Sequence, residues 1–307
     1  MKLPVTVIGG YLGAGKTTLI NHLLRNADGL RLAVLVNEFG ALAIDEDLIE
    51  AEDDGLMSIS GGCVCCAYGN DMIGALEDIR DAELSFDHVL LEASGVALPA
   101  SIMTTVSLIS GLRPDATVVL ADAEQIRRNA ANKYLTDTIQ RQLEQADILL
   151  ITKADLVTRE QLADVSKWLK TRVPSARILP VERGQVPLDA IVGALPLPAR
   201  GVAPMRAPHS DFASTVLRPD GPVDAQALAE KLAADPTVTR AKGYIAQGNR
   251  LALIHVVGHR HAVEEAEGEH EIGVVCIGLK HEFSPQSIDV LAAQSMSAAL
   301  NKKGAVT

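Results

Sequence analysis

The amino-acid sequence predicts an α/β domain built on a mostly parallel sheet, followed by a smaller α+β domain. In the first part of the chain, short apolar runs such as residues 32–36 and 148–151 alternate with segments long enough for a helix. Because all-apolar strands separated by helices are typical of a sheet covered on both faces, this part predicts a parallel sheet. From residue 212 onward, strand-like segments follow one another with fewer helical segments between them, which favours an antiparallel sheet.

A segment interrupted by Pro and Gly separates the two parts, and residues 196–209 are interpreted as a linker between domains at residues 1–195 and 210–307. The strands expected in the first domain are residues 3–8, 32–36, 57–60, 89–91, 117–121, 148–151 and 178–181. The helices expected between them are residues 17–25, 72–79, 135–145, 159–170 and 188–195.

The second domain is expected to have strands at residues 212–217, 243–246, 251–257 and 273–277, and helices at residues 224–234 and 284–300. Asp224 has the position of a helix N-cap, and Pro285 stands at a helix start. The acidic run at residues 264–271 is interpreted as an exposed loop.

The composition bounds the function. The chain has 307 residues, 48% of them hydrophobic, and a formal net charge of −11 at pH 7. This charge argues against binding to nucleic acid or to an anionic membrane surface. No apolar stretch approaches the roughly 20 residues that span a bilayer. The N-terminal apolar run ends at the Gly9-Gly10 turn and is not interpreted as a signal peptide, so a cytoplasmic protein is expected.

Residues 10–17, GYLGAGKT, fit the pattern G-x-x-x-x-G-K-[ST] of a loop that binds nucleotide phosphates, between an expected strand and an expected helix. Its glycines let backbone N–H groups point at an anion, and the helix N-terminus adds partial positive charge. Lys16 is expected to act on the β- and γ-phosphates, and Thr17 to ligate Mg²⁺. The first domain is therefore predicted to be a P-loop NTPase domain. Its predicted phosphate-binding residues are Gly10, Gly13, Ala14, Gly15, Lys16, Thr17 and Thr18.

The segment Thr152-Lys153-Ala154-Asp155 follows an expected strand and indicates the base. A carboxylate at Asp155 can accept hydrogen bonds from N1–H and N2–H₂ of guanine, whereas adenine offers no such pair. The stem of Lys153 can lie over the base plane while its ammonium stays in water. Thr152 stands where Asn is more familiar in the N-K-x-D pattern. The predicted ligand is GTP or GDP.

Glu92 ends an expected strand, where P-loop proteins keep an acidic group beside the phosphates. It is the predicted catalytic partner of Lys16, either holding Mg²⁺ through a water or orienting the attacking water, and the alternative is a carboxylate that caps the next turn. Gly95 is expected to offer its N–H to the γ-phosphate. Asp122 and Asp45 are weaker candidates than Glu92 for the same metal, and the sequence does not rank the two.

Three cysteines, Cys63, Cys65 and Cys66, fall within four positions of an extended segment. Thiolates suit Zn²⁺ and other late first-row metals, and three ligands leave a position open for release. Glu38 is a candidate oxygen ligand for the same transition metal. The alternative is that the thiols are buried or form a redox pair. Cys276 is interpreted as a buried structural thiol, and most of the histidines between residues 255 and 281, notably His259, His261 and His270, as loop residues rather than metal ligands.

Together these segments resemble the CobW family of metal-chaperone GTPases, relatives of the hydrogenase and urease maturation GTPases of the HypB and UreG type. The matching segments are GYLGAGKTT at residues 10–18, NEFG at 37–40, GCVCC at 62–66, EASG at 92–95 and TKAD at 152–155, with RAKG at 240–243 and CIG at 276–278 in the second domain. Ala41 stands where many members carry an acidic residue, and the linker lacks the histidine-rich insertion of many members.

The resemblance implies Mg²⁺-dependent GTP hydrolysis coupled to transfer of Zn²⁺, Co²⁺ or Fe²⁺ to a client metalloprotein, with Cys63, Cys65 and Cys66 as metal ligands. It also admits a nucleotide-dependent homodimer. Two alternatives remain open: a P-loop kinase or ATPase that acts on a small molecule and has structural cysteines, and a zinc reservoir or sensor stabilised by nucleotide. The metal, the client and the oligomeric state cannot be read from the sequence.

Overall fold

The computed structural model describes residues 2–27, 29–36, 49–53, 56–59, 63–67, 71–83, 85–193, 212–221, 223–247 and 250–303. For residues 49–53, 56–59, 63–67 and 296–303 only the course of the backbone is described. The chain divides into two units, Met1–Leu188 and Asp189–Thr307. The linker predicted at residues 196–209 lies outside the described residues, so its bounds stay a prediction.

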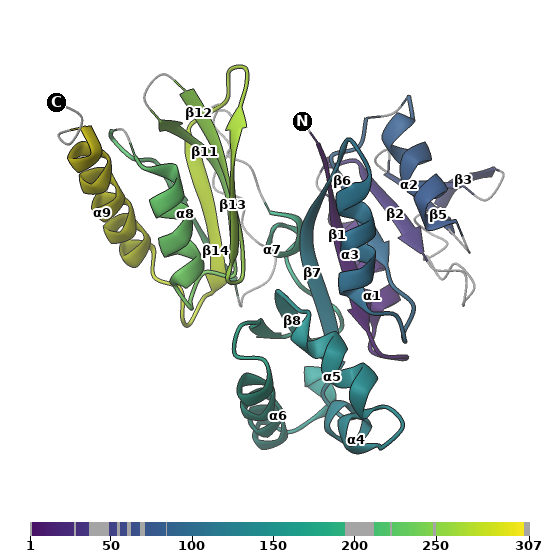
Figure 1. Ribbon diagram of the computed structural model, residues 1–307. Helices are drawn as coiled ribbons and strands as arrows, with labels where there is room; N and C mark the ends of the chain where they lie inside the picture. The colour runs from purple at the N-terminus through teal and green to yellow at the C-terminus, as the bar shows by residue number, and fades with distance from the viewer. Residues whose placement is uncertain are drawn as a thin grey trace. The chain divides into compact units, whose positions relative to one another are not determined.

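In the first unit the described strands form one nine-stranded sheet in the order β3-β4-β5-β2-β6-β1-β7-β8-β9 (Figure 1). Neighbours from β5 to β9 pair in parallel, whereas β3 and β4 extend the edge by antiparallel pairing. The mostly parallel sheet is therefore confirmed. Its strands are β1 (Leu3–Gly10), β2 (Leu32–Val36), β3 (Ile49–Asp53), β4 (Leu56–Ile59), β5 (Cys63–Ala67), β6 (His88–Glu92), β7 (Leu112–Asp122), β8 (Ile148–Thr152) and β9 (Arg177–Pro180).

Amphipathic helices cover this sheet. The helices are α1 (Lys16–Arg25), α2 (Met72–Asp81), α3 (Pro99–Leu108), α4 (Ile126–Ala131), α5 (Thr136–Glu144) and α6 (Arg159–Arg172), with the 3₁₀ turn η2 (Ala154–Leu156). The short α7 (Leu188–Val192) begins at the last residue of this unit and otherwise belongs to the second. One core joins α2 and α3 to apolar side chains of β1, β2 and β6, and a second joins α4, α5 and α6 to β7 and β8. The sequence prediction omitted β3, α3 and α4.

The parallel register brings the polar strand ends to one edge of the sheet. Ile8 of β1 lies beside Glu92 of β6, and Asp122 of β7 lies beside Thr152 of β8. From β1 the chain crosses to β2 on one side, while β7 lies directly against β1 on the other. Such a reversal of strand order at the carboxyl ends is where open α/β sheets bind ligands.

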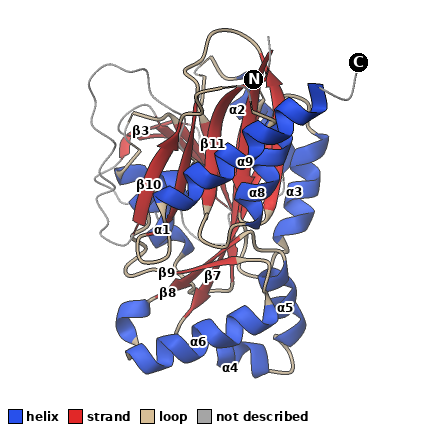
Figure 2. Ribbon diagram, turned by 90° about the vertical axis from the view of Figure 1, so that its left-hand side faces the viewer, coloured by secondary structure: helices blue, strands red, loops and turns tan. Residues whose placement is uncertain are grey.

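The second unit is an antiparallel sheet in the order β10-β14-β11-β12-β13, with α8 and α9 over one face (Figure 2). Its elements are β10 (Phe212–Leu217), α8 (Ala225–Ala234), β11 (Arg240–Gln247), β12 (Arg250–Val257), β13 (Arg260–Ala266), β14 (Gly273–Leu279) and α9 (Pro285–Lys303). Asp224 caps α8 by accepting the Ala227 N–H at 3.1 Å, as predicted. The α+β domain is confirmed.

The interpretation of residues 264–271 as an exposed loop is wrong over its first part. Glu264 and Glu265 belong to β13, which pairs with β12 along its length. β13 lies at the end of the sheet order and exposes the polar side chains of Arg260, His261 and Glu265, with Val263 packed against the core. Charged residues are common on edge strands because they oppose further strand pairing, and they erase the apolar pattern that predicts a strand. No helix in the described part of the chain is long and apolar enough to cross a membrane.

Candidate functional site

The phosphate-loop segment joins β1 to α1, the context that its sequence motif requires. Gly10 has φ 132°, and a Cβ on it would lie 2.6 Å from the Leu120 carbonyl oxygen of β7, so only glycine permits this passage. Gly13 and Gly15 have φ values of 75° and 93°, a region that L side chains rarely adopt. Three glycines therefore shape a turn that ends at Lys16, the first residue of α1.

Lys16 and Glu92, both buried, form a cluster with the half-buried Thr17 at the mouth of this loop. The Lys16 ammonium donates a hydrogen bond to the Gly10 carbonyl at 3.1 Å, and the Thr17 hydroxyl donates one to the Glu92 carboxylate. Burial lowers the pKa of Lys16, and the negative charge of Glu92 partly opposes this shift. Burial also raises the pKa of Glu92, while Lys16 and Thr17 act in the opposite direction.

This cluster has the chemistry that Mg²⁺ and a polyphosphate need. Carboxylate and hydroxyl oxygens are hard ligands that suit Mg²⁺, and Glu92 and Thr17 supply one of each within hydrogen-bond distance. Lys16 adds a cation at the start of a helix. Because both Lys16 and Glu92 are only 8% exposed, charges brought by a ligand would act on them in a poorly solvated setting.

The turn after β6 lies directly against the phosphate loop. Ser94 accepts the Ala97 N–H at 3.0 Å, which closes a turn around Gly95. A Cβ on Gly95 would lie 2.5 Å from Leu12 Cδ2 and 2.9 Å from the Leu12 nitrogen. Because Gly95 has no side chain, this turn can approach the backbone of the phosphate loop. The Gly95 N–H, which was predicted to contact the γ-phosphate, belongs to this turn.

The predicted base-binding segment is linked to the phosphate loop by Thr152. Thr152 is only 4% exposed, and its hydroxyl donates a hydrogen bond to the Ala14 carbonyl at 2.8 Å. This contact gives a physical reason for threonine at the position where asparagine is more familiar. A β-branched hydroxyl residue suits the end of a buried strand and still links the two loops.

Lys153 differs from its expected setting. It has a left-handed backbone, φ 57°, and its ammonium pairs with Asp122 at 2.6 Å rather than standing in water. Asp122 also accepts the Glu124 N–H at 2.9 Å. The candidate Mg²⁺ carboxylate Asp122 is therefore engaged with the base-binding loop, whereas Glu92 lies in the phosphate cluster. Asp45, the other candidate, lies outside the described residues.

A loop after β9 adds residues that no sequence motif indicated. Arg183, with φ 51°, places its Nε 3.9 Å from Asp155 Oδ2. A Cβ on Gly184 would lie 3.3 Å from Thr18 Cγ2, so this loop reaches the start of α1. Ala154 donates its N–H to the Val181 carbonyl at 3.3 Å. The loop therefore borders both Asp155, the predicted base-binding carboxylate, and the start of α1.

The cysteine segment is an extended strand, as expected. Cys63, Cys65 and Cys66 belong to β5, which pairs in parallel with β2. In register, Ala67 of β5 lies beside Val36 of β2, and Val36 lies beside Glu92 of β6. The end of the cysteine strand is thus two strand spacings, roughly 10 Å, from the backbone of Glu92. Glu38 lies outside the described residues.

The C-terminal histidines have separate surroundings. His270 stacks on Tyr244 with ring centroids 4.0 Å apart, and His261 lies 3.2 Å from the Gln226 amide. The interpretation as loop residues is wrong for His261, which lies in β13, and for His255, which is buried in β12. Among the described residues, no group of three or more potential metal ligands occurs. Cys276 is fully buried in β14, which raises the pKa of its thiol, and its interpretation as a structural thiol is confirmed.

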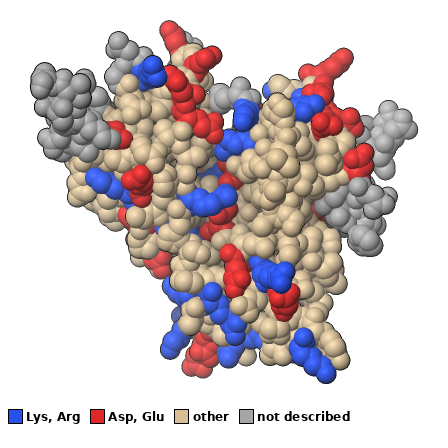
Figure 3. Space-filling view, in the orientation of Figure 1, with Lys and Arg blue, Asp and Glu red and all other residues tan. Residues whose placement is uncertain are grey.

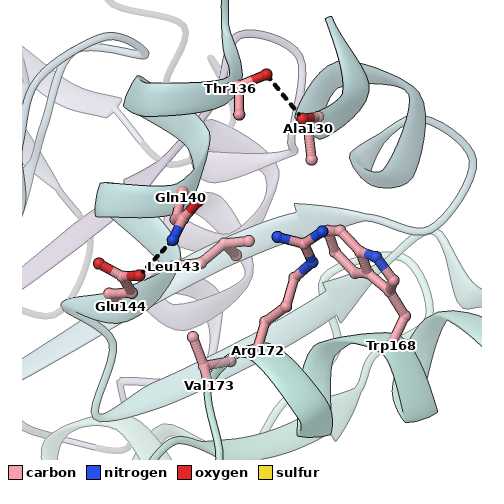
Figure 4. A pocket seen from close by; sticks show the side chains of 8 residues that line it. All are labelled: Ala130, Thr136, Gln140, Leu143, Glu144, Trp168, Arg172 and Val173. Atoms are coloured by element: carbon pink, nitrogen blue, oxygen red, sulfur yellow. Dashed lines mark hydrogen bonds between the residues drawn. The ribbon is translucent and has the colours of Figure 1, made fainter.

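A small pocket between α4, α5 and α6 lies apart from these loops (Figure 4). Its volume of about 10 Å³ is enough for roughly one water molecule. The Arg172 guanidinium lies over the Trp168 ring at 4.5 Å, and Gln140 donates to Glu144 at 2.8 Å. On the face shown in Figure 3, acidic and basic side chains mix over this helical region. The pocket is too small for a nucleotide and is interpreted as a packing feature.

The fold and these loops define a nucleotide-binding protein of the P-loop class. Residues 4–180 match the family model described as CobW/HypB/UreG, nucleotide-binding domain. Residues 212–290 match the model of the cobalamin synthesis protein cobW C-terminal domain. The chain belongs to the CobW/HypB/UreG family, and the resemblance drawn from its motifs is confirmed.

Similar proteins carry zinc-related names. The chain is 32% identical over 224 residues to the zinc chaperone CobW of Pseudomonas aeruginosa, covering 62% of this chain and 60% of that protein. It is 32% identical over 199 residues to the zinc chaperone YjiA of Escherichia coli, covering 62% of this chain and 60% of that protein. It is 30% identical over 229 residues to the zinc-regulated GTPase metalloprotein activator 1 of Dictyostelium discoideum, covering 62% of this chain and 48% of that protein. The matched region thus spans about three fifths or less of each relative.

Among solved structures, the zinc-bound YjiA GTPase from E. coli aligns with a TM-score of 0.48 and 22% identity, covering 96% of this chain and 99% of that one. HypB from Helicobacter pylori in complex with nickel aligns with a TM-score of 0.40 and 20% identity, covering 59% and 80%.

Proposed function

We propose that this chain is a Mg²⁺-dependent GTPase that binds a transition metal at its cysteine strand and passes it to a client metalloprotein. The observation that carries the proposal is the register that joins the two sites. Ala67, Val36 and Glu92 stand in line on three adjacent strands. A change at the phosphates therefore has a short route, through β2, to the segment that bears the cysteines.

The nucleotide site supports GTP as the substrate. In this proposal Gly10, Gly13, Ala14, Gly15, Lys16, Thr17, Thr18 and Gly95 bind the phosphates, and Thr152, Lys153 and Asp155 bind the guanine. Lys16 stabilises charge on the transferring phosphoryl group. Glu92 either orients the attacking water or would hold Mg²⁺ through a water. Thr17 and Glu92 would hold Mg²⁺, which supplies neutralisation of the phosphate charge when bound.

The cysteine strand supports zinc as the cargo, with Co²⁺ and Fe²⁺ as competitors. Cys63, Cys65 and Cys66 supply soft ligands, and Glu38 is the proposed oxygen ligand. The names of the relatives in Pseudomonas aeruginosa, Escherichia coli and Dictyostelium discoideum support the choice of zinc. Delivery to a client metalloprotein, and a homodimer formed with nucleotide, follow from the family resemblance and are part of the proposal.

Coupling between the sites is tested by measuring zinc affinity with a chelator competition. The protein is loaded with Mg²⁺ and a slowly hydrolysed GTP analogue, with GDP, or with no nucleotide. We expect the affinity for Zn²⁺ to change by at least tenfold between the GTP and GDP forms, the range of 1–3 kcal/mol that is typical of coupled sites. Equal affinity in all three states would exclude coupling.

Variants separate the metal site from the nucleotide site. Cys65→Ser should remove tight zinc binding and leave GTP affinity within about twofold, since serine is a poor ligand for Zn²⁺. Cys276→Ala is the matched control, because Cys276 is a buried thiol of the second unit, and its zinc stoichiometry should equal that of the wild type. Loss of GTP binding in Cys65→Ser would instead indicate a structural metal, and tighter ATP than GTP binding would favour a kinase or ATPase.

A further inference from the structure

Gln142 of α5 is a buried side chain that the proposed mechanism does not yet use. It is 2% exposed, and its amide nitrogen donates to two backbone carbonyls, Gly95 O at 3.1 Å and Ala97 O at 2.9 Å. A side-chain amide has two N–H donors, so both are used on one short segment. That segment is the turn that follows Glu92.

The same turn lies against the phosphate loop on its other side. Gly95 approaches Leu12 so closely that a Cβ would lie 2.9 Å from the Leu12 nitrogen. The turn is thus held between two elements, the phosphate loop and α5. Its own closure is the single hydrogen bond from Ala97 N–H to Ser94 O at 3.0 Å, supplemented by a 3.4 Å contact from Val96 N–H to the Ser94 hydroxyl.

We infer that Gln142 is a positioning residue that fixes the Gly95 turn against the phosphate loop and thereby sets the preference for nucleoside triphosphate over diphosphate. The inference rests on the proposed function, in which Gly95 offers its N–H to the γ-phosphate. The two carbonyls belong to the Gly95–Val96 and Ala97–Leu98 peptide planes, which are rigid and flank the plane that carries the Ala97 N–H. The Ala97 N–H binds Ser94 O at 3.0 Å, and Ser94 O shares its peptide plane with the Gly95 N–H, so Gln142 holds the Gly95 N–H through this hydrogen bond. A diphosphate has no γ-phosphate for this turn to contact.

A second glutamine of the same helix region provides a matched control. Gln145 Oε1 accepts the Ala100 N–H at 2.9 Å in the first turn of α3. This contact is exposed to solvent, and it pairs a backbone N–H at the start of α3 rather than a carbonyl of the turn beside the phosphate loop. Gln142 and Gln145 therefore share residue type and neighbouring segment, and differ in whether they hold the Gly95 turn.

The test compares affinities for a slowly hydrolysed GTP analogue and for GDP, both with Mg²⁺. Gln142→Met keeps the shape of the side chain and removes both donors. We expect the affinity for the GTP analogue to fall about tenfold, as for the loss of a buried hydrogen-bonding partner, while GDP affinity stays within about twofold. Gln145→Met should leave both affinities unchanged. A second variant, Gln142→Asn, keeps the amide but shortens its reach, and should also lose triphosphate preference.

The outcomes separate this inference from the proposed function. Equal losses of GTP and GDP affinity in both Gln142 variants would mean that Gln142 only supports folding, and would overturn the inference. An unchanged GTP-to-GDP affinity ratio in folded Gln142→Met would also overturn it. If the wild-type protein itself binds neither GTP nor GDP, the proposed function fails instead.

Discussion

The phosphate end and the base end of the candidate site hold their charges in different ways. At the phosphate end, Lys16 and Glu92 are both buried. Burial lowers the pKa of Lys16 and raises the pKa of Glu92, so it favours the neutral form of each side chain. At the base end, Lys153 and Asp122 form a 2.6 Å ion pair, and the Lys153 side chain is 32% exposed. The charges of Lys16 and Glu92 are destabilised by desolvation, whereas those of Lys153 and Asp122 are stabilised by direct contact.

This difference indicates that the two ends have different tasks. At the base end the left-handed backbone of Lys153 and its ion pair with Asp122 hold the segment in one arrangement with its charges paired. The phosphate end carries buried charges that an incoming Mg²⁺–nucleotide can compensate, so it has more to gain from binding. We therefore expect the base end to select the nucleotide and the phosphate end to respond to it.

Asp155→Asn gives the largest expected effect on nucleotide affinity that tests this division. Loss of the carboxylate should lower GTP affinity by about 10- to 100-fold, the value of hydrogen bonds to a charged group. Xanthosine triphosphate, which can accept from the new amide, should bind in its place. If the base end only selects, the turnover of bound xanthosine triphosphate should match that of GTP on the wild type, measured by single-turnover phosphate release.

The control for this substitution is Asp220→Asn, on a residue of the second unit. It should change neither the affinity for GTP nor that for xanthosine triphosphate. A low turnover with saturating xanthosine triphosphate would show that Asp155 also acts on the phosphate end. That result would break the comparison between the two ends.

The sequence predicted the parts of the site that lie in one short segment each. The phosphate loop, the Glu92 segment and the base-binding segment each combine a strand end with a fixed residue pattern, and the parallel sheet brings strand ends to one edge. The extended course of the cysteine segment could be predicted for the same reason. These features depend on local sequence and on the fold class alone.

The contacts that the sequence did not predict join separate elements. Asp122 meets Lys153 across β7 and β8, and Gln142 reaches Gly95 over 47 residues. Arg183 approaches Asp155 from a loop that carries no motif. Such pairings depend on register and helix placement, which no single segment specifies. Asp122 in particular was predicted only as a weaker candidate for Mg²⁺, unranked against Asp45, and its partner Lys153 could not be predicted from either segment.

Thr152→Val tests the link between the two ends with a smaller expected effect. The substitution keeps the β-branched shape and removes the hydroxyl that donates to Ala14 O at 2.8 Å. Loss of one neutral hydrogen bond should weaken GTP and GDP binding equally, by about 1 kcal/mol or roughly fivefold. Thr152→Ser keeps the hydroxyl and should retain most of the affinity. A loss confined to GTP would indicate that Thr152 acts on the γ-phosphate.

The smallest expected effect concerns stability without nucleotide. The pKa of Glu92 is raised above its ordinary value of 4.5, so the folded state holds this proton more tightly than the unfolded state. The resulting stabilisation is fully present below pH 4.5 and is lost as the pH rises through the folded-state pKa. Glu92→Gln has no titrating proton at this position. The free energy of unfolding of the variant should therefore increase relative to that of the wild type as the pH rises through this window.

Urea denaturation of both proteins across this pH range measures the difference, and Glu124→Gln, on an exposed carboxylate, is the control that should follow the wild type. The same Glu92→Gln variant should lose GTP hydrolysis by about 100-fold or more, if Glu92 orients the attacking water. Gain in stability together with loss of turnover is the expected signature of a buried charge kept for its function. A variant that is less stable than the wild type throughout the range would mean that Lys16 already compensates Glu92 fully. The phosphate end would then be as well compensated as the base end, and the contrast between them would disappear.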